Sequence, residues 1–152
     1  MTLAKARKIL KTVGIITIIG SAITILISIM IVVGLDDLVA SEMEIQTEAQ
    51  YQELEAFFVV SAVALIAAGI CSLVEGVFSI LASRNNRYGK ICWLFSIVSI
   101  VTTIYQFISN LFKGRYEWYN PVSMLIALAL NVLALYAAKT VKSAYEEETR
   151  QA

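Results

Sequence analysis

The segment that most restricts how this chain can fold is residues 57–82, FFVVSAVALIAAGICSLVEGVFSILA. It exceeds the roughly 20 apolar residues that a helix needs to cross a bilayer. It also contains one ionisable residue, Glu75. A charged side chain is costly in hydrocarbon, so a membrane helix turns such a residue toward other protein. The segment therefore predicts a membrane helix with one face packed against neighbouring helices.

Three further apolar segments predict three more spans, at residues 12–33, 91–112 and 122–138. The first is too long for the apolar part of a cleaved signal peptide, which has roughly 7–15 residues. Hydrophobic residues make up 59% of the 152 residues and charged residues only 16%, a composition typical of a membrane protein. We expect an all-α chain with a single four-span membrane domain, residues 1–152.

Small and polar residues follow one face of each predicted span at alternating steps of three and four. The clearest stripe lies in residues 91–112 and consists of Cys92, Ser96, Ser99, Thr103, Gln106 and Asn110. Lipid provides no hydrophobic drive for helix association, so faces of this kind pack through close contact and hydrogen bonds. An average step of 3.5 predicts left-handed crossing in an up-and-down four-helix bundle.

Basic residues predict the orientation of the spans. Four of them precede the first span, three lie between the second and third spans, and Lys139 and Lys142 follow the fourth. The opposite side has only Lys113 and Arg115. Cytoplasmic loops carry the excess of Lys and Arg, so both termini are predicted to lie in the cytoplasm.

The loop between the first two spans, residues 34–56, has seven acidic residues and no basic one. In the predicted orientation it lies outside the cytoplasm. Its composition favours a solvated helical hairpin that caps the bundle and extends the second span into water. The alternative is an acidic surface for cations or a basic partner. The carboxylates lack the spacing and the glycine of a calcium-binding loop.

Counting residues from the cytoplasmic ends places several polar side chains at one depth in the bundle. At about 1.5 Å per residue, Glu75, Asn131, Ser99 and Ser21 fall about 13 Å into the membrane. Ser72, one helical turn from Glu75, is a further candidate for this group. We expect the five residues to form an intramembrane polar layer.

Two roles for Glu75 follow from this layer. In the first, it binds a proton, a cation or a cationic substrate in a small transporter or channel. In the second, the protonated carboxyl group joins helices through hydrogen bonds, and the protein acts as an accessory, assembly or immunity-type interaction factor. The second role is favoured because the sequence has no second intramembrane carboxylate and no broken helix marked by paired Gly and Pro.

Composition argues against several other classes. The chain has no His, and its two cysteines, Cys71 and Cys92, lie in or beside apolar segments. We therefore expect no enzyme activity, disulfide framework, metal centre or cofactor. Lys and Arg equal Asp and Glu at twelve each, and no basic patch predicts nucleic-acid binding. The expected partners are the lipid bilayer and either another membrane protein or a second copy of the chain.

Residues 73–104, LVEGVFSILASRNNRYGKICWLFSIVSIVTTI, carry one resemblance. They resemble the second span, turn and third span of small uncharacterised four-span bacterial membrane proteins. The resemblance implies a protein of the bacterial inner membrane and supplies no site residues. The small multidrug-resistance transporters also have four spans and an essential intramembrane Glu, but theirs lies in the first span, where this chain has no acid.

Overall fold

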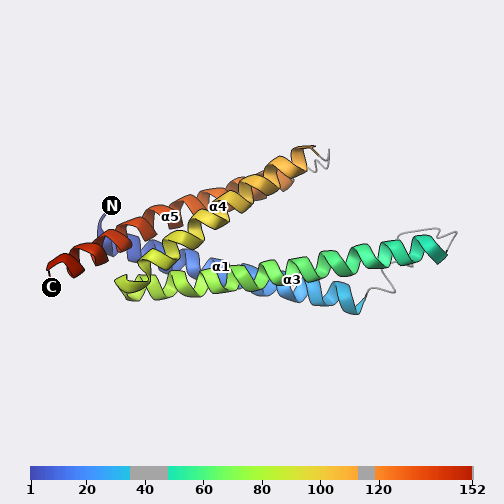
Figure 1. The fold of residues 1–152 in the computed structure, drawn as a ribbon, viewed down its shortest axis with the longest axis horizontal. Helices are drawn as coiled ribbons and strands as arrows, with labels where there is room; N and C mark the ends of the chain where they lie inside the picture. The colour runs from blue at the N-terminus through green and yellow to red at the C-terminus, as the bar shows by residue number, and fades with distance from the viewer. Residues whose placement is uncertain (35–47, 113–118, 152) are drawn as a thin grey trace. The chain divides into compact units, whose positions relative to one another are not determined.

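The computed structural model describes residues 1–34, 48–112 and 119–151 and is all-helical over these ranges (Figure 1). Its elements, in chain order, are α1 (Leu3–Val33), α3 (Glu48–Arg84), the short 3₁₀ helix η1 (Asn86–Tyr88), α4 (Gly89–Phe112) and α5 (Tyr119–Gln151). Four helices in the described residues are long and apolar enough to cross a membrane. This agrees with the prediction of a multi-pass helical membrane protein.

The outer surfaces of these helices are strongly apolar. Large hydrophobic side chains such as Val33, Val60 and Leu125 are 81%, 69% and 61% exposed. A soluble protein rarely exposes continuous apolar surface on this scale, whereas lipid solvates it without cost. The exposed side chains are thus suited to contact with acyl chains.

The helices extend beyond the predicted spans. Helix α3 begins at Glu48 and includes part of the acidic segment, while α5 continues from the predicted span end at residue 138 to Gln151. The first extension is rich in Glu, Ala and Gln and the second in Glu and Lys, residues that favour helix in water, although hydropathy does not detect them. The rest of the predicted acidic hairpin, residues 35–47, lies outside the described residues.

The chain divides into two compact units. The four-helix unit consists of Met1–Ile16 and Glu75–Ala152, and so contains parts of α1 and α3 together with η1, α4 and α5. The two-helix unit is Thr17–Val74 and contains the remaining parts of α1 and α3.

The core of the four-helix unit is built mainly from small side chains contributed by all four long helices. It consists of Ala6, Leu10, Ala82, Cys92, Ala137, Ala138 and Val141. Small residues let helix backbones approach closely, which increases van der Waals contact. At the start of α4, a Cβ on Gly89 would lie 2.7 Å from the backbone nitrogen of Lys142. The first residue of α4 therefore contacts the backbone of α5.

Helices α4 and α5 pack along each other in opposite directions. Gly89 at the start of α4 contacts Lys142, near the end of α5. Further along α4, Thr103 contacts Asn131, which lies earlier in α5. Because rising positions in one helix meet falling positions in the other, the pair is antiparallel.

A buried asparagine links the turn before α4 to both ends of the chain. Nη2 of Arg7 in α1 donates to Oδ1 of Asn86 at 2.9 Å, and Nδ2 of Asn86 donates to Oε1 of Glu148 in α5 at 2.7 Å. Asn86 is only 6% exposed, so both halves of its amide need partners. We call these three residues the Asn86 bridge. Hydrogen bonds to charged groups contribute more than neutral ones, so the bridge anchors the last helix to the first.

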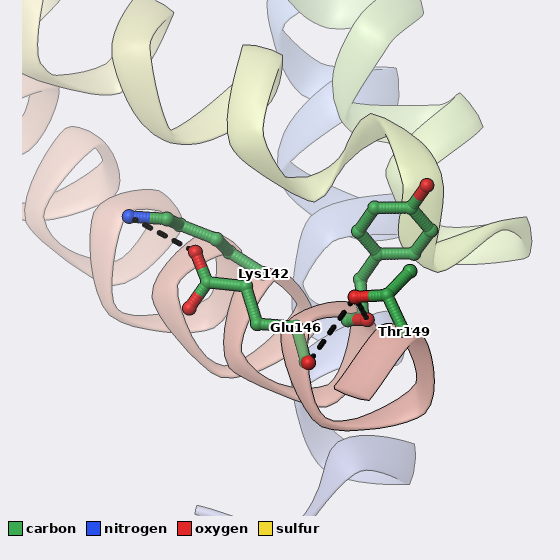
Figure 2. A network of polar contacts seen from close by, with 4 residues as sticks. Lys142, Glu146 and Thr149 are labelled. Atoms are coloured by element: carbon green, nitrogen blue, oxygen red, sulfur yellow. Dashed lines mark hydrogen bonds and ion pairs between the residues drawn. The ribbon is translucent and has the colours of Figure 1, made fainter. Parts of the chain in front are cut away.

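The polar end of α5 has its own network (Figure 2). Nζ of Lys142 lies 3.7 Å from Oε1 of Glu146, and Oγ1 of Thr149 donates to the carbonyl oxygens of Tyr145 and Glu146. The Lys142 ammonium also lies 4.3 Å from the centroid of the Trp93 ring in α4. Lys142 thereby adds a cation–π contact between α4 and α5 to its helical ion pair.

In the two-helix unit, α1 and α3 meet at Gly69. A Cβ on Gly69 would lie 2.6 Å from Cγ1 of Ile25 and 3.5 Å from the carbonyl oxygen of Ser21. The hydroxyl groups of Ser21 and Ser28 donate to carbonyl oxygens four residues earlier in α1. This intrahelical bonding satisfies the hydroxyl groups in an apolar environment.

Replacing Gly14 by Ala tests the close packing of α1 on α3 in the four-helix unit. The new Cβ would lie 2.8 Å from the carbonyl oxygen of Gly76 and 3.1 Å from Cβ of Ser79. Overpacking against backbone typically costs about 1–3 kcal/mol, so we expect the G14A variant to unfold more easily. The free energy of unfolding, measured by denaturing-detergent titration of the purified protein, reports this loss.

The matched control is Gly20→Ala in the same helix, where an added Cβ meets no atom within 4 Å. We expect this variant to be neutral or more stable by up to about 1 kcal/mol, since Ala is the better helix former. Equal effects of the two substitutions would contradict the close contact at Gly14.

Candidate intramembrane polar site

Glu75 of α3 and Ser99 of α4 are joined directly. Oγ of Ser99 donates to Oε2 of Glu75 at 2.6 Å, and both side chains are half-buried. The next residue in α3, Gly76, is buried and its carbonyl oxygen faces Gly14 of α1. Successive residues of a helix point about 100° apart, so with Gly76 against α1, Glu75 faces α4. The close α1–α3 contact thus positions the carboxyl group.

Helix α5 joins this pair through Thr103. Oγ1 of Thr103 donates to the carbonyl oxygen of Ser99 at 2.8 Å, and Nδ2 of Asn131 donates to Oγ1 of Thr103 at 3.4 Å. The second distance is long for a hydrogen bond, so that contact is the weaker one. Polar groups of α3, α4 and α5 therefore form one connected series, Glu75–Ser99–Thr103–Asn131.

A second polar contact between α3 and α4 lies one turn from the first along α3 and two turns from it along α4. Oγ of Ser79 is 3.5 Å from Sγ of Cys92, and Oγ of Ser96 donates to the Cys92 carbonyl oxygen at 3.0 Å. All three side chains are buried. Cys92 is a small core residue, as interpreted from the sequence, and its sulfur also contacts a hydroxyl group.

The other two residues of the predicted layer lie in the two-helix unit. Ser21 and Ser72 line one groove between α1 and α3, with a volume of about 320 Å³. The remaining lining residues are also small or hydroxyl-bearing: Thr17, Gly20, Thr24, Ala68 and Gly69. Oγ of Ser21 donates to the carbonyl oxygen of Thr17 at 2.7 Å. A shared layer of Ser21 and Ser72 with Glu75 stays a prediction.

An apolar cavity of about 80 Å³ lies beside the polar series, between α4 and α5. Thr103 and Leu128 are among its lining residues, with Phe107 and Met124 nearer the other end of the pair. The Thr103 hydroxyl group already donates to the Ser99 carbonyl oxygen and accepts from the Asn131 amide. The cavity therefore presents apolar surface.

The chemistry available at this site is hydrogen bonding and the binding of a proton or cation at one carboxyl group. Within the described ranges, no group of three or more His, Cys, Asp or Glu side chains is arranged to hold a metal ion. Ser99 is bonded to a carboxyl group and has no imidazole to activate it, because the chain contains no His.

Sequence reasoning overlooked two parts of this arrangement. Thr103 was placed on the polar stripe but not in the layer, although it stands one turn from Ser99 on the side of Asn131. The Asn86 bridge was not predicted, because its partners are far apart in the sequence. A polar amide in a short basic turn was the only local signal for it.

No protein-family model matches this chain, and comparisons with curated proteins and with solved structures gave no match either. Function is therefore inferred from the residues and their geometry.

Replacing Ser99 by Ala should weaken the contact between α3 and α4. Hydrogen bonds between membrane helices average about 0.6 kcal/mol and reach about 1.7 kcal/mol, so we expect a loss in that range. Glu75→Gln retains an acceptor oxygen for Ser99 and should remain close to the wild type. Denaturing-detergent titration of Ser99→Ala, Glu75→Ala and the double variant, each of which removes the contact, gives the coupling energy between the two residues.

Thr102→Ala serves as the control, since the exposed Thr102 hydroxyl bonds only to the Val98 carbonyl oxygen of its own helix in the described structure. A coupling energy of zero between positions 75 and 99 would show that their contact adds nothing to stability.

Proposed function

We propose that this chain is a non-enzymatic multi-pass membrane protein that acts through contact with other membrane proteins, as an accessory, assembly or immunity-type factor. The observation that carries the proposal is the groove between α1 and α3 of the two-helix unit. Its lining, which includes Gly20, Ala68 and Ser72, is small or hydroxyl-bearing. Surfaces of this composition admit close packing of another membrane helix.

The proposal includes a left-handed up-and-down bundle with both termini in the cytoplasm. The alternating spacing of small residues and the distribution of Lys and Arg support it. The antiparallel packing of α4 on α5 is consistent with this topology. The resemblance of residues 73–104 supports a location in the bacterial inner membrane. Labelling of single introduced cysteines from either side of the membrane tests the orientation.

Filling the groove should disrupt a complex formed in the native membrane. We expect the wild-type protein to migrate above the mass of one protomer on blue native gels, and Ala68→Leu to return it to one protomer. The larger side chain occupies the space that a partner helix requires. The measurement uses full-length protein in membranes of the cell that produces it.

The matched control is Val63→Leu, an exposed position on the opposite face of α3. It should leave the complex intact. A wild-type protein that is a lone protomer in its own membrane would contradict the proposed function.

A second candidate function is a small transporter or channel for protons, cations or cationic substrates. The polar series Glu75–Ser99–Thr103–Asn131 favours it, because an intramembrane carboxyl group in contact with other polar groups is the usual element of such a pathway. The hydrogen bond from Ser99 to Glu75 fits a structural role equally well. Transport ranks second because the sequence has no second intramembrane carboxylate.

Flux measurements on proteoliposomes separate the two candidates. If Glu75 carries a proton or cation, wild-type proteoliposomes exceed protein-free liposomes in flux and Glu75→Gln abolishes the difference. If Glu75 only joins helices, both proteins match the protein-free liposomes. Ser99→Ala provides the comparison variant, since it alters the contact but retains the carboxyl group.

A further inference from the structure

A groove of the four-helix unit combines positive charge with apolar walls. It lies between α1 and α5 and has a volume of about 330 Å³. From α1 it is lined by Lys5, Lys8, Ile9 and Ile16 among others, and from α5 by Leu130 and Leu133. Lys5, Lys8 and Ile16 share one side of α1, because at 100° per residue their directions fall within about 80° of one another.

The charged and apolar parts of the groove are separated along α1. Both lysines lie at its N-terminal end and are exposed. Ile16 follows Lys8 by about 12 Å at the rise of an α-helix, and the side chains between them on this face are mostly apolar. No acidic side chain is among the lining residues of this groove. The groove therefore fits a ligand with an anionic end and an apolar body.

We propose that this groove binds one negatively charged phospholipid, with its phosphate between Lys5 and Lys8 and an acyl chain along Ile9, Ile16, Leu130 and Leu133. Basic pockets between membrane helices at the cytoplasmic side recognise anionic headgroups. The lysines precede the span predicted to start at residue 12, which places them at headgroup depth. The proposal depends on the proposed membrane orientation and not on the role as an interaction factor.

Charge and position favour a lipid over the other occupants. A free phosphate would use the lysines alone, whereas a phospholipid also places an acyl chain on Ile16 and Leu133, which are 47% and 50% exposed. The walls come from α1 and α5, so a bound lipid would contact both the first and the last helix. Ligands that bind only the folded state stabilise it, and anionic lipid should therefore stabilise the four-helix unit.

Native mass spectrometry of the full-length protein tests the proposal. The lipids are phosphatidylglycerol and phosphatidylcholine with identical acyl chains, which differ in net charge. We expect the wild-type protein to retain phosphatidylglycerol at least about tenfold more tightly. In Lys5→Gln/Lys8→Gln, that affinity should fall about tenfold or more, since each lysine near an anionic surface contributes substantially to binding.

The matched control is Lys11→Gln/Lys90→Gln, which removes the same net charge from two exposed lysines that are not among the lining residues of the groove. It should change the affinity less than threefold. Ile16→Trp retains both lysines and fills the apolar part, so it should weaken phosphatidylglycerol binding as strongly as the double lysine variant. Circular dichroism and melting without added lipid check that each variant is folded.

Three results would overturn the proposal. An equal loss of phosphatidylglycerol affinity in the test and control lysine variants would mean that general surface charge, and not this groove, attracts the lipid. Equal retention of phosphatidylcholine would mean that headgroup charge is not recognised. Displacement of the lipid by soluble glycerol phosphate at similar concentration, with no effect of Ile16→Trp, would mean a site for free phosphate.

Discussion

Backbone contact between helices is the constraint on which this structure depends. Inside a bilayer, moving apolar surface from lipid to protein gains little, so helices associate only where their atoms meet closely. Gly14 of α1 reaches the Gly76 carbonyl oxygen of α3, and Gly89 of α4 reaches the backbone of Lys142 in α5. Alanines fill most of the surrounding core. The large side chains are left to face outward, where they are suited to contact with lipid.

The same contacts decide which polar groups meet. With Gly76 held against α1, Glu75 faces α4 and finds the Ser99 hydroxyl. Antiparallel packing of α4 on α5 then brings Asn131 to Thr103. The polar series and the apolar cavity beside it are consequences of helix packing, and neither requires a dedicated loop. Any ligand that separated α3 from α4 would have to replace the Ser99 hydrogen bond.

The sequence predicted the four apolar helices because length and hydropathy determine a span almost alone. Counting depth from the basic residues placed Glu75 and Ser99 in one polar layer with Asn131 and Ser21, and the first two share a hydrogen bond. Depth counting has a resolution of about one turn, so it did not identify Thr103 as the residue that Asn131 contacts. Hydropathy carried no information about α5 beyond residue 138, where a helix of polar and charged residues follows the span. The sequence did not predict the Asn86 bridge, because Arg7 and Glu148 bind Asn86 from distant positions in the chain.

The Asn86 bridge also has a consequence for the order of biosynthesis. Arg7 leaves the ribosome 141 residues before Glu148 does. At typical synthesis rates of about 5–20 residues per second, on the order of ten seconds separates them. Leu10 of α1 and Val141 of α5 belong to the same core cluster, so this core is also completed late. Helix α1 is therefore synthesised well before the helix it binds, and the four-helix unit can close only after α5 has been made.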